Sequence, residues 1–134
     1  MLIVDRIQHY IGPDVELRTL GFICSEAYLA FAYDHRDPSL YKVVGSDDII
    51  KFLPIDAPEE SKHVTQTVLV FHCSLQLDDL MLCFKWNIEV GRKYEVVLTM
   101  GDGLCRYHLG DVVEAVGFDP HDGQLIIHYL EVRL

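Results

Sequence analysis

The 134-residue chain carries 11 Lys and Arg residues against 21 Asp and Glu residues, which gives a formal net charge of −10 at pH 7. Hydrophobic residues make up 50% of the chain, enough to build a core, so an intrinsically disordered segment is excluded. The acidic balance also argues against a nucleic-acid-binding surface, because phosphate contacts require a face rich in Lys and Arg.

Residues 2–11 are predicted to form an amphipathic helix. Ile3, Ile7 and Ile11 recur at helical spacing and would form one apolar stripe. The dipeptide Gly12-Pro13 is expected to end the helix, because glycine suits a left-handed cap and proline cannot continue the turn.

The pattern changes to alternation after the helix. Apolar and charged residues alternate over residues 15–19, which predicts a strand leading into residues 20–24. Residues 27–33 are apolar throughout and fit either a buried strand or one helical turn. Residues 34–39 have the composition of a loop.

The rest of the chain is predicted to be rich in β-strands separated by glycine- and aspartate-containing turns. The candidate strands are Tyr41–Val44, Ile49–Leu53, Thr67–His72, Tyr94–Leu98, Cys105–Leu109, Val112–Phe118 and Leu125–Val132. Short strands about ten residues apart indicate a small sheet or barrel. The expected fold class is therefore α+β: mostly antiparallel β, as a small sheet or partial barrel, with one N-terminal helix.

The cysteines and the N-terminus indicate the expected compartment. Cys24, Cys73, Cys83 and Cys105 show no CxxC spacing, which favours free thiols in the cytoplasm. The N-terminus has no signal-peptide pattern. The longest apolar run, Val68–Cys73, is far shorter than the roughly 20 residues that a membrane span needs. We expect a soluble cytoplasmic protein without membrane association.

Asp111 is the first candidate for a ligand-binding residue. It follows Gly110, whose missing side chain lets a ligand or another backbone approach closely. At this position a carboxylate could accept two hydrogen bonds from a vicinal diol such as a ribose. The alternative is that Asp111 bonds its own backbone in a tight turn.

The segment Phe22–Glu26 is a second candidate site. A strand here would end in an aromatic ring, the Ser25 hydroxyl and the Glu26 carboxylate, and strand ends are the usual place for ligands in open sheets. The alternative is that Ser25 and Glu26 simply begin a helix or turn.

The sequence gives less support to a metal site built from histidines or to catalysis by a cysteine. The seven histidines are dispersed without metal-ligand spacing, so we do not expect a zinc site. A thiol-dependent hydrolase using Cys24 or Cys105 with a histidine remains open, although no local signature supports it.

Taken together, these segments resemble the Gretchen Hagen auxin-responsive family of acyl-acid amido synthetases, within the adenylate-forming superfamily. Residues 91–118 are similar to the family block G-x-x-Y-E-L-V-x-T … G-L-Y-R-Y-R-V-G-D-V … G-F. Phe22–Glu26 resembles the motif Y-A-S-S-E, and Ile49–Ile55 resembles x-Y-F-E-F-L-P. The blocks occur in the family's order, and the resemblance covers residues 1–56 and 86–134.

The resemblance implies a site for ATP and Mg²⁺. Asp111 matches the aspartate that holds the ribose hydroxyls, and Phe22 takes the place of the tyrosine that stacks on adenine. Ser25 matches a serine beside the nucleotide. Glu26 matches the carboxylate near the magnesium and phosphates, and is the implied metal ligand. Such roles suit the chemistry, because a carboxylate pairs with a diol, an aromatic ring with a purine and a hard oxygen with Mg²⁺.

Arg106 and Tyr107 complete the implied nucleotide-binding set. They match the beginning of the family pattern R-Y-R-x-G-D. Two residues depart from the family: Cys24 replaces the first serine of its motif, and His108 replaces the second arginine.

Parts of the family pattern have no counterpart in the chain. A Ser/Thr/Gly-rich phosphate loop and a smaller C-terminal domain are missing, so we expect residues 1–134 to form a single partial domain, the distal part of the large N-terminal domain. Residues 57–85 match nothing in the family. This apolar stretch is predicted to be either an atypical insertion or an ordinary extra hairpin.

The implied function is an ATP-dependent ligase that adenylates a carboxylic acid and then forms an amide with an amino acid. The chain is expected to be inactive alone, because the N- and C-terminal portions of the enzyme would be needed. The alternative is a non-catalytic mixed α/β module that binds a protein partner through its apolar insertion.

Overall fold

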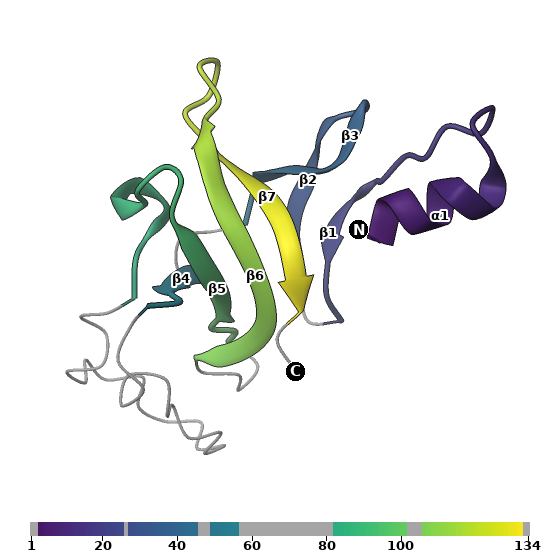
Figure 1. The fold of residues 1–134 in the computed structure, drawn as a ribbon. Coiled ribbons are helices and arrows are strands. Elements are labelled where there is room, and N and C mark those ends of the chain that lie inside the picture. The colour runs from purple at the N-terminus through teal and green to yellow at the C-terminus, as the bar shows by residue number, and fades with distance from the viewer. Residues whose placement is uncertain (1–2, 26, 46–48, 57–81, 102–105, 133–134) are drawn as a thin grey trace.

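The computed structural model describes residues 3–25, 27–45, 49–56, 82–101 and 106–132. Its elements are α1 (Ile3–Ile11), β1 (Gly21–Ile23), β2 (Tyr28–Asp34), β3 (Asp37–Val43), β4 (Ile50–Pro54), the 3₁₀ helix η2 (Lys85–Asn87), β5 (Lys93–Leu98), β6 (Tyr107–Phe118) and β7 (Leu125–Val132). Within these residues the strands form one seven-stranded sheet in the order β1-β2-β3-β7-β6-β5-β4 (Figure 1). All neighbouring strands are antiparallel. The predicted fold class, mostly antiparallel β with one N-terminal helix, is confirmed.

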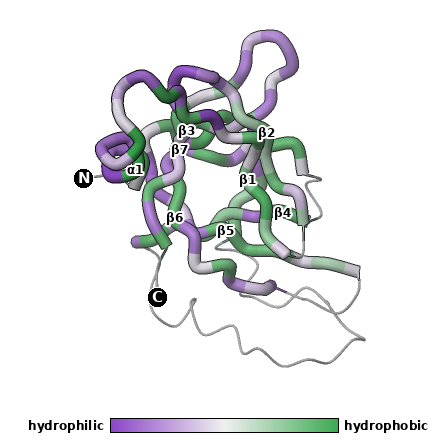
Figure 2. Tube along the Cα trace, turned by 90° about the vertical axis from the view of Figure 1, so that its right-hand side faces the viewer, coloured by the Kyte–Doolittle hydropathy of each residue, from purple (hydrophilic) through white to green (hydrophobic). Residues whose placement is uncertain are grey.

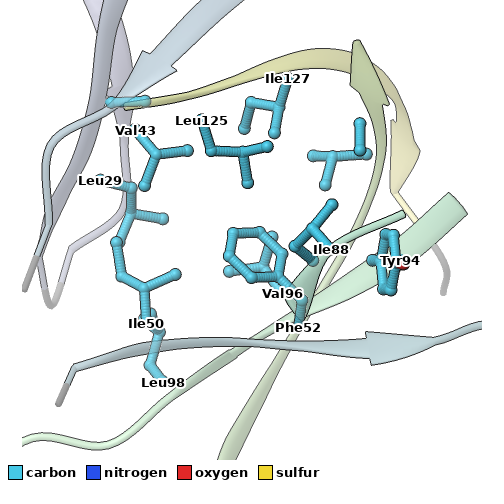
Figure 3. Packing of buried hydrophobic residues seen from close by; sticks show 13 residues of the cluster. Leu29, Val43, Ile50, Phe52, Ile88, Tyr94, Val96, Leu98, Leu125 and Ile127 are labelled. Carbon is cyan, nitrogen blue, oxygen red and sulfur yellow. The ribbon is translucent and has the colours of Figure 1, made fainter. Parts of the chain in front are cut away.

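The sheet is open and curls around a core on its concave side. Leu29 on β2 and Ile50 on β4 are separated by four strands in the sheet order, yet they belong to the same buried cluster. Phe52 and Tyr94 fill its centre, each 1% exposed. Figure 3 shows Leu29 directly beside Ile50, with Val43 and Phe52 in the same cluster. The curvature therefore brings side chains of distant strands onto one shared face.

The α-helix forms where the apolar spacing predicts it. Gly12 ends it with a φ of +86°, and its N–H donates to the carbonyl of Gln8 over 3.0 Å. The helix lies to one side of the sheet (Figure 1), and Ile7 and Tyr10 remain 42% and 82% exposed. In the part of the chain that the structure describes, no helix has the length and apolar composition needed to span a membrane.

Three local predictions about strands are wrong. Residues 15–20 have no regular structure, so the first strand is only β1. The expected loop at 34–39 shrinks to a tight turn, because Asp34 pairs with Asp37 and its Oδ1 accepts the Arg36 N–H over 2.9 Å. The two strands expected on either side of Gly110 are one continuous strand, β6. The candidate strand at 67–72 lies outside the described residues.

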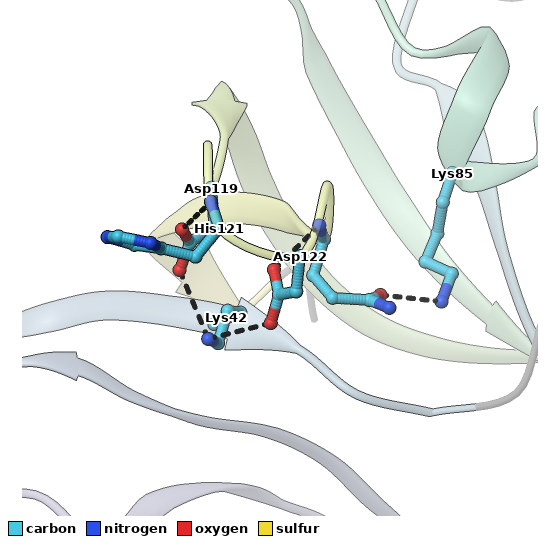
Figure 4. A network of polar contacts seen from close by, with 6 residues as sticks. Lys42, Lys85, Asp119, His121 and Asp122 are labelled. Atoms are coloured by element: carbon cyan, nitrogen blue, oxygen red, sulfur yellow. Dashed lines mark hydrogen bonds and ion pairs between the residues drawn. The ribbon is translucent and has the colours of Figure 1, made fainter.

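An ionic contact holds the turn between β6 and β7 against β3. Lys42 Nζ lies 3.1 Å from Asp119 Oδ2 and 3.0 Å from Asp122 Oδ2 (Figure 4). The N–H of His121 also donates to Asp119 Oδ1 over 2.8 Å. This backbone bond and the Lys42 ammonium both hold the pKa of Asp119 below its ordinary value. Figure 2 shows the wider pattern, with hydrophobic residues along the strands and hydrophilic ones mainly in the connections.

Candidate functional site

The site is built on an irregularity in β6. Between Glu95 and Val97 the pairing of β5 with β6 shifts register, so that β6 gains residues relative to its neighbour. Gly110 lies in this bulge with a φ of +85°, a conformation that glycine adopts without steric cost. Bulges of this kind turn a side chain away from the regular direction of a strand. The residue that follows Gly110 is Asp111.

The Asp111 carboxylate is bonded to the neighbouring strand. Tyr129 on β7 donates its hydroxyl hydrogen to Asp111 Oδ1 over 3.1 Å, and both residues are half-buried. Burial raises the pKa of Asp111, while the bond from Tyr129 lowers it. The alternative in which Asp111 bonds its own backbone in a turn is not what the structure shows.

Tyr129 remains a hydrogen-bond donor at neutral pH. Burial, together with the charge of Asp111 and the bond to it, raises the pKa of the Tyr129 phenol to about 12. The phenol is therefore protonated at neutral pH and can donate its hydrogen to the carboxylate. The Tyr129 hydroxyl bonds only Oδ1 of Asp111, and no described residue bonds Oδ2. Oδ2 can therefore accept a hydrogen bond from a ligand.

The ring of Phe22 reaches the same place from β1, which forms one edge of the sheet. Its centroid lies 5.7 Å from that of Tyr129 in an edge-to-face arrangement and 5.9 Å from that of Tyr41 on β3. Phe22 pairs with Ala30 on β2. This small residue leaves room for the ring to extend over β2. Phe22 and Asp111, far apart in sequence, thus meet at Tyr129.

The other predicted residues of the segment after β1 are not assembled in this way. Ser25 is exposed, in a turn where the Cys24 N–H donates to the carbonyl of Ala27 over 3.0 Å. The Ala27 N–H in turn donates to Cys24 Sγ over 3.3 Å. Glu26, the predicted metal ligand, lies outside the described residues.

Arg106 and Tyr107 lie at the start of β6, before the bulge. Arg106 is 9% exposed, has a φ of 51°, and its N–H donates to Thr99 Oγ1 over 3.2 Å. Tyr107 pairs with Leu98 and packs against the main core cluster. Tyr107 shares β6 with Asp111, and Arg106 immediately precedes this strand. The hydrogen bond and the ring contact of Tyr129 are with Asp111 and Phe22 rather than with these two residues.

His108, which departs from the family pattern, faces away from this cluster of rings. Its neighbours Tyr107 and Leu109 pack against the main core cluster, so alternation places the His108 side chain on the other face of β6. There its Nδ1 lies 2.9 Å from Glu95 Oε1, while its buried Nε2 has no hydrogen-bond partner among the described residues. The described contact of His108 is therefore with Glu95 on β5, not with Asp111.

Sequence reasoning missed Tyr129, the residue that contacts both Asp111 and Phe22. Tyr129 follows Ile127 by two residues and so shares the core face of β7. One feature of the sequence could have indicated Tyr129: it is an aromatic residue with a hydroxyl group, and it follows Leu125 and Ile127 on the apolar face of the same strand. Tyr41 was likewise predicted only as part of a strand.

The described residues hold no group of three or more His, Cys, Asp or Glu side chains that could bind a metal ion. Cys105, one of the two thiols considered for hydrolase chemistry, lies outside them, as does most of the stretch 57–85.

Comparison with known proteins identifies the family. The model of the "GH3 family central domain" matches residues 46–125. The chain is 30% identical over 121 residues to "Probable indole-3-acetic acid-amido synthetase GH3.12" of Oryza sativa subsp. japonica, covering 86% of this chain and 20% of that protein. It is also 30% identical over 118 residues to "Jasmonoyl--L-amino acid synthetase GH3.5" of the same organism, with 86% and 19% covered.

A solved structure has the same fold. The chain superposes on "GH3.15 acyl acid amido synthetase" with a TM-score of 0.64 and 17% identity, over 96% of this chain and 19% of that one. The chain spans about a fifth of the length of the curated relatives that it matches. Sequence and fold agree with the resemblance found in the motifs, and the chain belongs to the GH3 family of acyl-acid amido synthetases.

Proposed function

We propose that this chain supplies the ribose- and adenine-binding part of an ATP-dependent acyl-acid amido synthetase. The observation that carries the proposal is the convergence of Phe22 and Asp111 on Tyr129. A carboxylate beside an aromatic face matches the two ends of a nucleoside, because the carboxylate accepts hydrogen bonds from the ribose diol and the ring packs against the purine.

The proposed reaction has two steps. A carboxylate oxygen of the acid attacks the α-phosphorus of ATP, which forms an acyl-adenylate and releases pyrophosphate. The amine of an amino acid then attacks the acyl carbon, forming the amide and releasing AMP. Relatives named as indole-3-acetic acid-amido and jasmonoyl–L-amino acid synthetases support this class of acid and acceptor. This chain's part is to hold and orient the nucleoside.

Mg²⁺ belongs to the proposal through the nucleotide. In phosphate-transfer sites this ion commonly keeps several waters and takes one or two carboxylates together with substrate phosphates. Glu26 is the one carboxylate that the motif assigns to it. The ion would neutralise charge on the phosphates, while Phe22 and Asp111 act on the nucleoside.

Binding of AMP to the 134-residue chain tests the proposal. Calorimetry or NMR titration with AMP and with 2′,3′-dideoxy-AMP measures how much the ribose hydroxyls contribute. We expect AMP to bind more tightly than the dideoxy compound. Asp111→Asn should weaken AMP binding about 10- to 100-fold, because hydrogen bonds to a charged group are lost, and should remove the preference for the diol.

Glu114→Gln is the matched control. Glu114 lies on the same strand and alternates with the core residues Val113 and Ala115, so it faces the opposite side of the sheet. This variant removes the same charge and should bind AMP as the unmodified chain does. Equal affinities of Asp111→Asn and Glu114→Gln for AMP, or equal affinity of the chain for both nucleotides, would contradict the proposal.

A further inference from the structure

The environment of Asp111 poses a problem for a ribose-binding carboxylate. The carboxyl is half-buried, and desolvation favours its neutral form. A neutral carboxyl also accepts hydrogen bonds from the two ribose hydroxyls less strongly than a carboxylate does, because the negative charge strengthens such bonds. Some group must hold the carboxylate in place and offset part of its desolvation.

Tyr129 is the residue whose geometry meets this need. Its hydroxyl bonds Asp111 Oδ1 across the β6–β7 pair over 3.1 Å. Its ring packs edge-to-face against Phe22, with 5.7 Å between centroids. One side chain thus contacts both parts of the proposed nucleoside site, the carboxylate through its polar tip and the aromatic ring through its body.

The position of Tyr129 is itself fixed from several sides. It packs against the main core cluster and shares the core face of β7 with Ile127. The ring of Phe22 packs against both Tyr129 and Tyr41, and the Tyr41 hydroxyl is 3.4 Å from Thr19 Oγ1. A hydroxyl held in this way costs little further ordering when a ligand binds.

Resting on the proposed function, we propose that Tyr129 is a positioning residue for nucleotide binding: it holds Oδ1 of Asp111, leaves Oδ2 for the ribose hydroxyls and supports the Phe22 ring. Tyr129 itself does not touch the ribose. Its effect on the ligand is transmitted through Asp111 and Phe22.

The test compares Tyr129→Phe with Tyr41→Phe in the 134-residue chain. Both variants lose one phenol hydroxyl and keep the ring, but only Tyr129 bonds Asp111. Tyr129→Phe should weaken AMP binding about tenfold, through loss of a hydrogen bond to a charged group. Tyr41→Phe should leave AMP affinity unchanged.

A pH titration separates positioning from a general structural effect. Besides Asp111, the groups whose charge acts on Tyr129 are Tyr41 on β3 and Glu131 on β7, whereas Asp111 is influenced by its burial and by the bond from Tyr129. Loss of the phenol should raise the pKa of Asp111, measured by carboxyl ¹³C NMR without nucleotide. The pH below which AMP binding is lost should rise with it. Phe22→Leu keeps the phenol and should not move this titration.

The outcomes distinguish the two proposals. Unchanged AMP affinity in Asp111→Asn overturns the nucleotide site and this inference with it. The inference alone is overturned by a different result. In that case Asp111→Asn weakens AMP binding, but Tyr129→Phe does not differ from Tyr41→Phe in AMP affinity or in the pKa of Asp111. The ligand-free titration gives a result for Tyr129 in either case.

Discussion

The proposed binding role of Asp111 comes with a cost to the stability of the fold. Its pKa is raised above the ordinary value of 3.8 by burial, so the folded protein favours the protonated carboxyl. Such a group stabilises the fold below its unfolded pKa, and this contribution is lost as pH rises through the higher pKa of the folded state. At neutral pH the ionised Asp111 is therefore a net cost to folding.

We expect Asp111→Asn to be more stable than the unmodified chain at pH 7. The amide is neutral and can still accept the Tyr129 hydrogen bond, so it avoids the desolvation of a charge. The difference in free energy of unfolding should narrow as pH falls toward 3.8, where the carboxyl of the unmodified chain becomes protonated. Urea unfolding of both chains over this pH range measures it. A difference that is constant with pH, or that grows on acidification, would contradict this.

The residue scale also shows what the motifs could and could not indicate. Asp111 and Phe22 were chosen because each lies in a block that resembles the family. Tyr129 lies in no such block, and its place beside Asp111 depends on the register between β6 and β7. That register shifts between Val112 and Val113. A shift of this kind depends on packing of the two strands and leaves no clear mark in the sequence.

At the scale of the element, β6 carries the site because it bends without ending. The sequence predicts that a strand ends near Gly110, because glycine weakens the interior of a strand. In the structure it takes a φ of +85°, and the strand continues on the far side. Glycine's freedom at positive φ thus introduces a bulge where a break was predicted.

Gly110→Ala should destabilise the chain by about 1–2 kcal/mol, because an L-residue with a side chain is strained at positive φ. AMP binding should weaken as well, since the bulge directs Asp111. Gly117→Ala is the control on the same strand: its added methyl group would meet nothing within 4 Å, and Gly117 has no positive φ. Urea unfolding and AMP titration of the two variants check this. Equal stability of the two would show that the bulge does not depend on glycine.

The elements that sequence patterns predicted well are those with strong local signals. The strand Leu125–Val132 occurs with the expected bounds, because an apolar run follows a turn rich in aspartate and glycine. Residues 15–20 alternate as a strand should, yet none of the strands that the structure describes pairs with them over that length. Alternation indicates a strand only where the fold supplies a partner.

For the whole molecule, curvature is the property that joins the parts of the site. The sequence predicted the class of the fold, and its resemblance predicted the family. Neither stated that β1 and β7, separated by β2 and β3, would meet on a concave face. Ala30, which pairs with Phe22, supplies one local reason, because it leaves space above β2 for the aromatic ring.

The central claim is that Phe22, Tyr129 and Asp111 form one nucleoside-binding surface on the concave face of the sheet. Backbone NMR of the 134-residue chain during AMP titration tests it most directly. The account predicts that the amide signals of these three residues shift together, with one common affinity, while those of Glu114 and His128 on the opposite face stay in place. Shifts confined to that opposite face, or Phe22 and Asp111 responding with different affinities, would contradict it.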